Sequence, residues 1–145
     1  MATKRSDGAQ VPGDVSLLRL YVLRALYAFI VVGLALVIWP TLLGHRADWP
    51  LMNSVVSAML GGVSLLALIG IFQPLRMLPL LLFELVWKAL WLLLVGLPLW
   101  SAGAIDPRTM ATVVDCLVGV VLVPIAMPWG YFFRRYLRGP GERWR

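Results

Sequence analysis

Charged residues, cysteine and histidine are all scarce in this sequence, and each scarcity excludes a class of protein. Only 14% of the 145 residues are charged, whereas about a quarter are charged in an ordinary soluble domain. The one cysteine, Cys116, cannot form a disulfide within the chain, and no CxxC pair or Cys/His cluster is present. The one histidine, His45, excludes a metal site built from several histidines of a single chain. We therefore expect neither a metal ion nor a cofactor.

The residue sets of the common enzymes are also missing. The sequence has no HExxH helix, no phosphate-binding loop, no dinucleotide fingerprint and no Ser/His/Asp set. The pair Gly61-Gly62 lies inside an apolar stretch, where it cradles no phosphate. We predict that the protein is not an enzyme.

What the sequence has in excess is apolar surface. Hydrophobic residues make up 61% of the chain, and the mean hydropathy is +0.86, which is typical of the membrane class. The net charge of +6 and the pI near 10.3 do not indicate nucleic-acid binding here. The basic residues gather at the two ends of the chain, as they do in membrane proteins, and no polar domain is present to carry a nucleic-acid site.

Four apolar stretches predict an all-α, polytopic membrane protein. A bilayer core of about 30 Å requires about 20 helical residues, and each stretch supplies them. The connections are short, which favours an antiparallel four-transmembrane-helix bundle. The predicted spans are about 17–43, 51–72, 79–100 and 109–133.

Basic residues outside the spans and near the start of the first span predict the orientation. One side, which carries both termini and the second loop, holds ten of them: Lys4, Arg5, Arg19, Arg24, Arg76, Arg134, Arg135, Arg138, Arg143 and Arg145. The other side holds only Arg46 and Arg108. The excess predicts a protein of the bacterial inner membrane with both termini in the cytoplasm. Residues 1–16 are predicted to be a disordered cytoplasmic tail, and residues 134–145 a basic cytoplasmic tail.

Four charged residues lie well inside the ends of the predicted spans: Arg24, Glu84, Lys88 and Asp115. An intramembrane charge costs at least about 2.5 kcal/mol and normally finds a partner inside the bundle. Glu84 and Lys88 are four residues apart and can pair with each other, while Arg24 lies at the depth of Glu84. On one face of the second span, three further side chains extend this set into a polar network: Asn53, Ser57 and Ser64. The network is interpreted either as a proton-linked or ligand-binding site, or as a structural salt-bridge lock.

Two other patterns have alternative interpretations. Three aromatic residues recur at every fourth position of the third span, and they either wall a pocket for a flat apolar ligand or serve packing and lipid contact: Phe83, Trp87 and Trp91. Three small residues in the second span have the same spacing, which allows two helices to approach closely: Ser54, Ala58 and Gly62. Their partner is either another helix of the bundle or a second copy of the chain.

The layout resembles small bacterial four-helix membrane proteins of the DoxX-like type. The resemblance rests on the length, the four spans, an early arginine in Leu17-Leu18-Arg19-Leu20 and a charged third span in Phe83-Glu84-Leu85-Val86-Trp87-Lys88. It covers most of the chain and implies a fold but no activity. The small multidrug transporters are similar in size, but their key glutamate lies in the first helix, where this chain has none.

From these observations we expect an accessory or structural subunit of a larger membrane assembly. The alternative is a small ligand-binding or proton-linked transport protein with an intramembrane polar site. The expected partners are the lipid bilayer and other membrane subunits or a second copy of the chain, and not nucleic acid.

Overall fold

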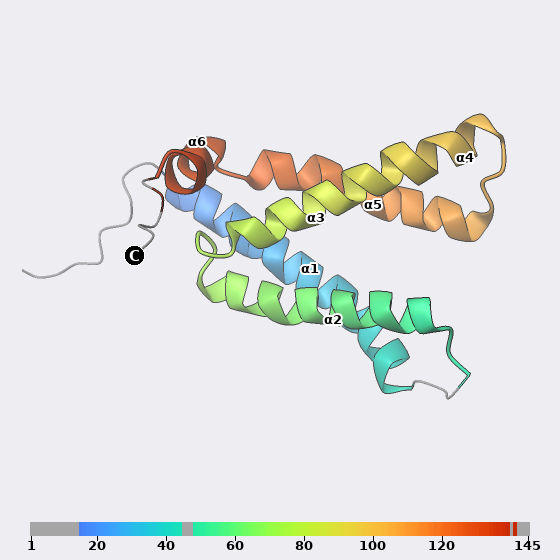
Figure 1. Ribbon diagram of the computed structural model, residues 1–145. Helices are drawn as coiled ribbons and strands as arrows, with labels where there is room; N and C mark the ends of the chain where they lie inside the picture. The colour runs from blue at the N-terminus through green and yellow to red at the C-terminus, as the bar shows by residue number, and fades with distance from the viewer. Residues whose placement is uncertain (1–14, 45–47, 140, 142–145) are drawn as a thin grey trace, which may run out of the picture.

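The computed structural model describes residues 15–44, 48–139 and 141, and this part of the chain is helical without strands (Figure 1). Four helical segments are long and apolar enough to cross a membrane: Leu17–Leu43, Leu51–Phe72, Leu78–Ser101 and Pro107–Ala126. The predicted all-α class is confirmed. The predictions for residues 1–14, 45–47, 140 and 142–145 lie outside the described residues.

The first two long helices form a closely packed hairpin. Helix α1 (Leu17–Leu43) begins at Ser16, whose hydroxyl caps the helix by accepting a hydrogen bond from the Arg19 amide at 3.3 Å. Helix α2 (Leu51–Phe72) approaches α1 through glycine: a Cβ on Gly70 would lie 2.5 Å from the ring of Tyr27. A Cβ on Gly61 would lie 2.8 Å from Leu42. Any larger residue at position 70 would therefore collide with the Tyr27 ring, so only glycine allows α2 to lie this close to α1.

The third span is one continuous helical segment with an irregular turn inside it. Helix α3 (Leu78–Trp91) leads into the π-helix η1 (Leu92–Gly96) and then into α4 (Leu97–Ser101). The Leu97 amide donates to the Leu92 carbonyl, five residues back. The wide turn comes directly before Pro98, which has no amide to donate, and such insertions bend a helix.

The fourth span is shorter than predicted, because α5 (Pro107–Ala126) ends well before residue 133. Met127 is extended, with φ −69° and ψ 126°, as expected for a residue that precedes a proline. Pro128 also has no amide for the Pro124 carbonyl, and the Trp129 indole Nε1 donates to that carbonyl instead, at 3.0 Å. At its other end α5 is capped by Asp106, and the hydrogen bonds from Thr109 lower the pKa of that carboxyl.

After this break the chain turns across the end of the other helices. Helix α6 (Trp129–Phe132) is seen end-on in Figure 1, and the π-helix η2 (Phe133–Leu137) continues it. Residues 134–137, which belong to the segment predicted as a basic tail, are therefore helical. The Tyr136 hydroxyl donates to the Leu75 carbonyl at 3.2 Å, and this bond ties η2 to the turn between α2 and α3.

The four long helices are arranged as two hairpins that are packed together unequally. Helix α1 contacts α2 far more extensively than the hairpins contact each other, and α3 contacts α5 somewhat more extensively than that. We call the end that carries the start of α1, the 73–77 turn and α6 the termini end, and the opposite end the loop end. The hairpins meet near the termini end and diverge toward the loop end (Figure 1). The buried cluster includes Leu23, Tyr27, Leu78, Leu81, Val123, Met127 and Phe132, which lie toward the termini end.

Candidate functional site

A groove of about 760 Å³ lies between the two hairpins. All four long helices contribute to its lining, which consists of Val37, Val56, Met59, Leu60, Val63, Phe83, Trp87, Trp91, Ala111, Thr112, Asp115 and Cys116. Most of these residues belong to the loop-end halves of their helices, where the hairpins diverge (Figure 1). The lining is apolar except for Thr112, the weakly polar Cys116 and one carboxylate.

The aromatic wall of this groove comes from α3. Phe83, Trp87 and Trp91, for which a pocket wall was one of two interpretations of their spacing, all line it. Phe83 is 45% exposed and lies at the rim. The indole Nε1 of Trp87 donates to the Glu84 carboxylate at 3.0 Å, so the ring is held in a fixed orientation.

The Glu84–Lys88 pair predicted from its spacing is present, and it lies behind Trp87. The Lys88 ammonium is 3.2 Å from one carboxylate oxygen of Glu84, and the Trp87 indole binds the other oxygen. Glu84 is only 3% exposed. The same ammonium lies 5.5 Å from the centre of the Trp87 ring. Both partners of Glu84 come from its own helix, so the pair does not by itself link two helices.

The contact that relates this pair to α5 was not predicted from the sequence. A Cβ on Gly119 would lie 2.7 Å from Lys88 Cδ and 2.8 Å from its Nζ, so the lysine side chain lies directly on this glycine. Cys116, one turn earlier on α5, is buried and lines the groove. Nothing in the sequence distinguishes Gly119 from the other glycines of the apolar stretches, because its role depends on which helix faces it.

Asp115 lines the groove and has no partner among the residues in the described ranges. Its side chain is exposed, and it has neither a hydrogen bond nor a salt bridge to any residue that the structure describes. It lies about 12 Å along the axis of α5 from Pro107, at about 1.5 Å per residue. Lys88, the nearest candidate by sequence, is already bound to Glu84.

The rest of the predicted polar network is dispersed over the molecule. Arg24 is exposed on α1, with its guanidinium carbon 5.9 Å from the centre of the Tyr21 ring, and it does not pair with Glu84. Ser64 is buried between α1 and α2, where it accepts a hydrogen bond from Trp39 Nε1 at 3.3 Å. Asn53 is exposed, and Ser57 is half-buried on the same helix. A continuous polar track across the bundle is therefore not formed.

The small-residue face of α2 points away from the chain's own helices. Ala58 and Gly62 are exposed, and a Cβ on Gly62 would meet nothing within 4 Å. Ser54 is half-buried, and its hydroxyl donates to the Leu51 carbonyl at 2.6 Å. Gly61 and Gly70, rather than Gly62, make the close approach to α1.

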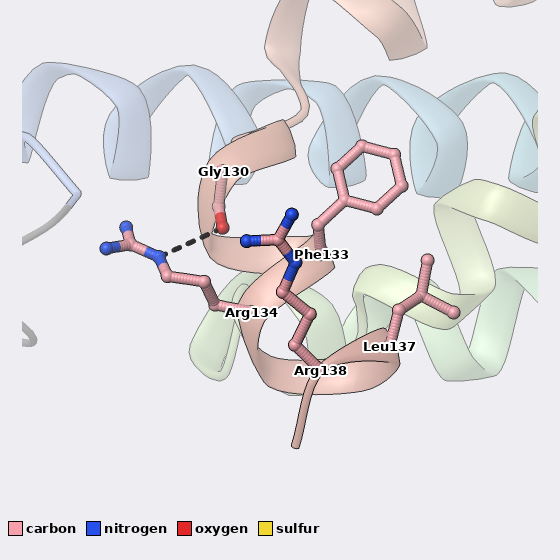
Figure 2. Close-up of a pocket in the computed structure, with 5 residues that line it drawn as sticks. All are labelled: Gly130, Phe133, Arg134, Leu137 and Arg138. Carbon is pink, nitrogen blue, oxygen red and sulfur yellow. Dashed lines mark hydrogen bonds between the residues drawn. The ribbon is translucent and has the colours of Figure 1, made fainter.

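A second, smaller concavity lies on the α6–η2 segment at the termini end. Its volume is about 460 Å³, and it is lined by Gly130, Phe133, Arg134, Leu137 and Arg138. Figure 2 shows the two arginines extending from one side of this short segment, with Arg134 Nε donating to the Gly130 carbonyl at 3.2 Å. Basic and apolar side chains are thus adjacent at this end, as in segments that lie at a membrane surface.

Comparison of the chain with protein-family models, curated proteins and solved structures finds no match. The resemblance to DoxX-like proteins therefore stays a prediction, and function is inferred below from the geometry of the groove.

Proposed function

We propose that this chain is a multi-pass protein of the bacterial inner membrane that binds a small hydrophobic ligand in the groove between its two hairpins. One observation carries the proposal: three aromatic side chains of α3 and a carboxylate of α5 line the same cavity of about 760 Å³. Ligand sites typically enclose about 300–1,000 Å³ and combine an apolar wall with a few placed polar groups. The groove has both properties.

The outward faces of the helices support a position within the bilayer. Large apolar side chains are exposed well inside each long helix, including Leu36 at 74%, Met59 at 55%, Leu94 at 71% and Val121 at 55%. In water such continuous apolar surface would drive aggregation, whereas lipid tails solvate it without cost. The helices also satisfy their own backbone hydrogen bonds, as a membrane span must.

The proposed orientation has both termini in the cytoplasm. It rests on the excess of basic residues at the termini end, where Arg76, Arg134 and Arg138 lie in the described part of the chain. Reporter fusions test it directly: a fusion at Ser101 is expected to report the outside, and a fusion after Arg145 the cytoplasm. A cytoplasmic signal from Ser101 contradicts the proposed layout.

Groove binding is tested by filling the groove. Ala111 lines it, whereas Val114 on the same helix is 52% exposed and does not. The test measures energy transfer from tryptophan to 1-pyrenemethanol, a flat neutral hydrophobe, with the full chain in zwitterionic nanodiscs. Ala111→Phe is expected to weaken the saturable signal at least about tenfold, a change of about 1.4 kcal/mol, because the new ring occupies the cavity. Val114→Phe adds comparable bulk toward lipid and serves as the matched control. Equal effects of the two substitutions, or no saturable signal in the parent protein, contradict groove binding.

The accessory-subunit interpretation is the second candidate, and a different surface favours it. The small residues Ala58 and Gly62 are exposed on α2, so a helix of another chain can approach the α2 backbone closely there. Purification in mild detergent tests this candidate, because a subunit is expected to bring a larger partner with it in fixed proportion. Recovery of the chain without a stoichiometric partner contradicts it.

A further inference from the structure

The chemical class of the ligand follows from the charges around the groove, provided that the proposed binding at the groove is correct. Glu84 and Lys88 are bound to each other at 3.2 Å, so their charges cancel. Asp115 lines the groove and has no cationic partner among the residues that the structure describes. One uncompensated negative charge is therefore presented to the cavity.

This charge is placed where it is costly to leave it unpaired. Asp115 lies within a helix long and apolar enough to span a membrane, about 12 Å from its first residue at about 1.5 Å per residue. An unpaired carboxylate at such a depth is strongly disfavoured, and intramembrane acids normally face a partner. Lys88 does not supply that partner, because its side chain is held by Glu84 and lies against Gly119. A cation that enters the groove would relieve this cost.

The α3 part of the groove lining has the chemistry that accompanies cation binding. Trp87 and Trp91 of α3 line the cavity together with Asp115 of α5. Indole faces attract cations through the negative potential of the ring and also provide a flat apolar surface. The Lys88 ammonium already lies 5.5 Å from the centre of the Trp87 ring, within the range of such an interaction.

We propose that the groove selects amphipathic monovalent cations, with the cationic group beside the Asp115 carboxylate and a flat apolar body against Trp87 and Trp91. A neutral molecule of the same shape would fill the apolar part but leave Asp115 unpaired. An anion of the same shape would be repelled by it. Selectivity for the cation is thus assigned to one residue, and shape selectivity to the aromatic wall.

The experiment compares two probes that share one aromatic body, (1-pyrenylmethyl)trimethylammonium and 1-pyrenemethanol. Saturable energy transfer from tryptophan is measured with the full chain in zwitterionic nanodiscs, and protein-free discs give the membrane partition of each probe. The parent protein is expected to bind the ammonium at least about tenfold more tightly than the alcohol after this correction. Asp115→Asn is expected to remove the preference, mainly by weakening binding of the ammonium, while Asp115→Glu is expected to keep the preference.

Asp106 offers a matched control on the same helix. Asp106→Asn makes the same change of charge at the exposed cap of α5, and asparagine caps a helix as well as aspartate does. It is expected to leave the preference for the ammonium intact.

The outcomes separate this inference from the proposed function. If both probes bind but the parent protein shows no preference, or if Asp115→Asn keeps the preference, the assignment to Asp115 is overturned and groove binding stands. If Asp106→Asn removes as much of the preference as Asp115→Asn, the effect is one of surface charge and the assignment is likewise overturned. If neither probe gives a saturable signal, groove binding itself is overturned.

Discussion

The two ends of the helical unit are built on different principles. At the termini end, large side chains are buried and fixed by hydrogen bonds: Tyr27 is fully buried and its hydroxyl donates to the Pro74 carbonyl at 3.0 Å. Toward the loop end the hairpins diverge, and large apolar residues that line the groove remain exposed there, Val37 at 65% and Met59 at 55%. The first arrangement is that of a core and the second that of a binding site, so substitutions at the two ends are expected to affect different properties.

Truncation of the central core aromatic residue is expected to have the largest effect. Tyr27→Ala removes a fully buried ring, and such changes in cores cost about 3–5 kcal/mol. Phe83→Ala is the matched change in the groove, and it should cost less than about 1 kcal/mol because the ring is nearly half exposed. Unfolding in detergent, followed by circular dichroism, measures both. Similar losses would mean that the groove is part of the core after all.

The Glu84–Lys88 pair adjoins the aromatic lining of the groove through Trp87, and its two charges are expected to stabilise each other. Lys88→Met leaves the buried Glu84 carboxylate without its cation, and breaking a well-buried pair costs about 3 kcal/mol or more. The double change with Glu84→Gln is expected to recover much of this loss, since no unpaired charge remains. A double-mutant cycle on the detergent-solubilised protein measures the coupling. Strict additivity of the two single changes would show that the pair does not interact.

The hydrogen bond between η2 and the 73–77 turn is expected to contribute less to the free energy of unfolding than the Glu84–Lys88 pair. Tyr136→Phe removes the hydrogen bond to the Leu75 carbonyl and keeps the ring that stacks on Phe132, so a loss of about 1 kcal/mol is expected. Tyr131→Phe is the control, because no hydrogen bond of its hydroxyl is present in the described structure. The Tm in detergent measures both changes. An equal shift for the two would show that the hydroxyl of Tyr136 contributes no specific bond.

The smallest effect on folding is expected on the outer face of α2. A Cβ at Gly62 meets nothing within 4 Å, so Gly62→Leu should change the stability of the monomer by less than about 0.5 kcal/mol. Gly70→Ala is the contrasting change, because its Cβ would lie 2.5 Å from the Tyr27 ring and must displace it. Size-exclusion chromatography with light scattering, together with the Tm, separates the two roles. Loss of an oligomer in Gly62→Leu alone would identify this face as an interface between chains.

Pairs of residues within one helix were the most predictable part of the site. Residues four apart on a helix lie on the same face whatever surrounds them, so the spacing of Glu84 and Lys88 sufficed to predict their ion pair. The same rule placed Phe83, Trp87 and Trp91 on one wall. Relations between helices were predicted less well: Arg24 lies exposed beside Tyr21, and Ser64 binds Trp39 rather than joining a polar track. Depth along a helix axis does not determine which face of that helix meets its neighbour.

The sequence by itself determined the helical class, the four apolar segments and the local faces of each helix, because these depend on hydropathy, length and the helical repeat. The early end of α5 also has its cause in the sequence, because Pro128 favours an extended residue before it. The predicted span nevertheless ran to residue 133, because the apolar stretch continues past this proline. Other relations were decided only by the tertiary structure. Gly61 and Gly70, rather than Gly62, face α1, and the Lys88 side chain lies against Gly119. Asp115 and Trp91 line the same groove. These relations depend on the rotation and divergence of the two hairpins, which are set by the sum of many weak contacts between helices and not by any short pattern along the chain.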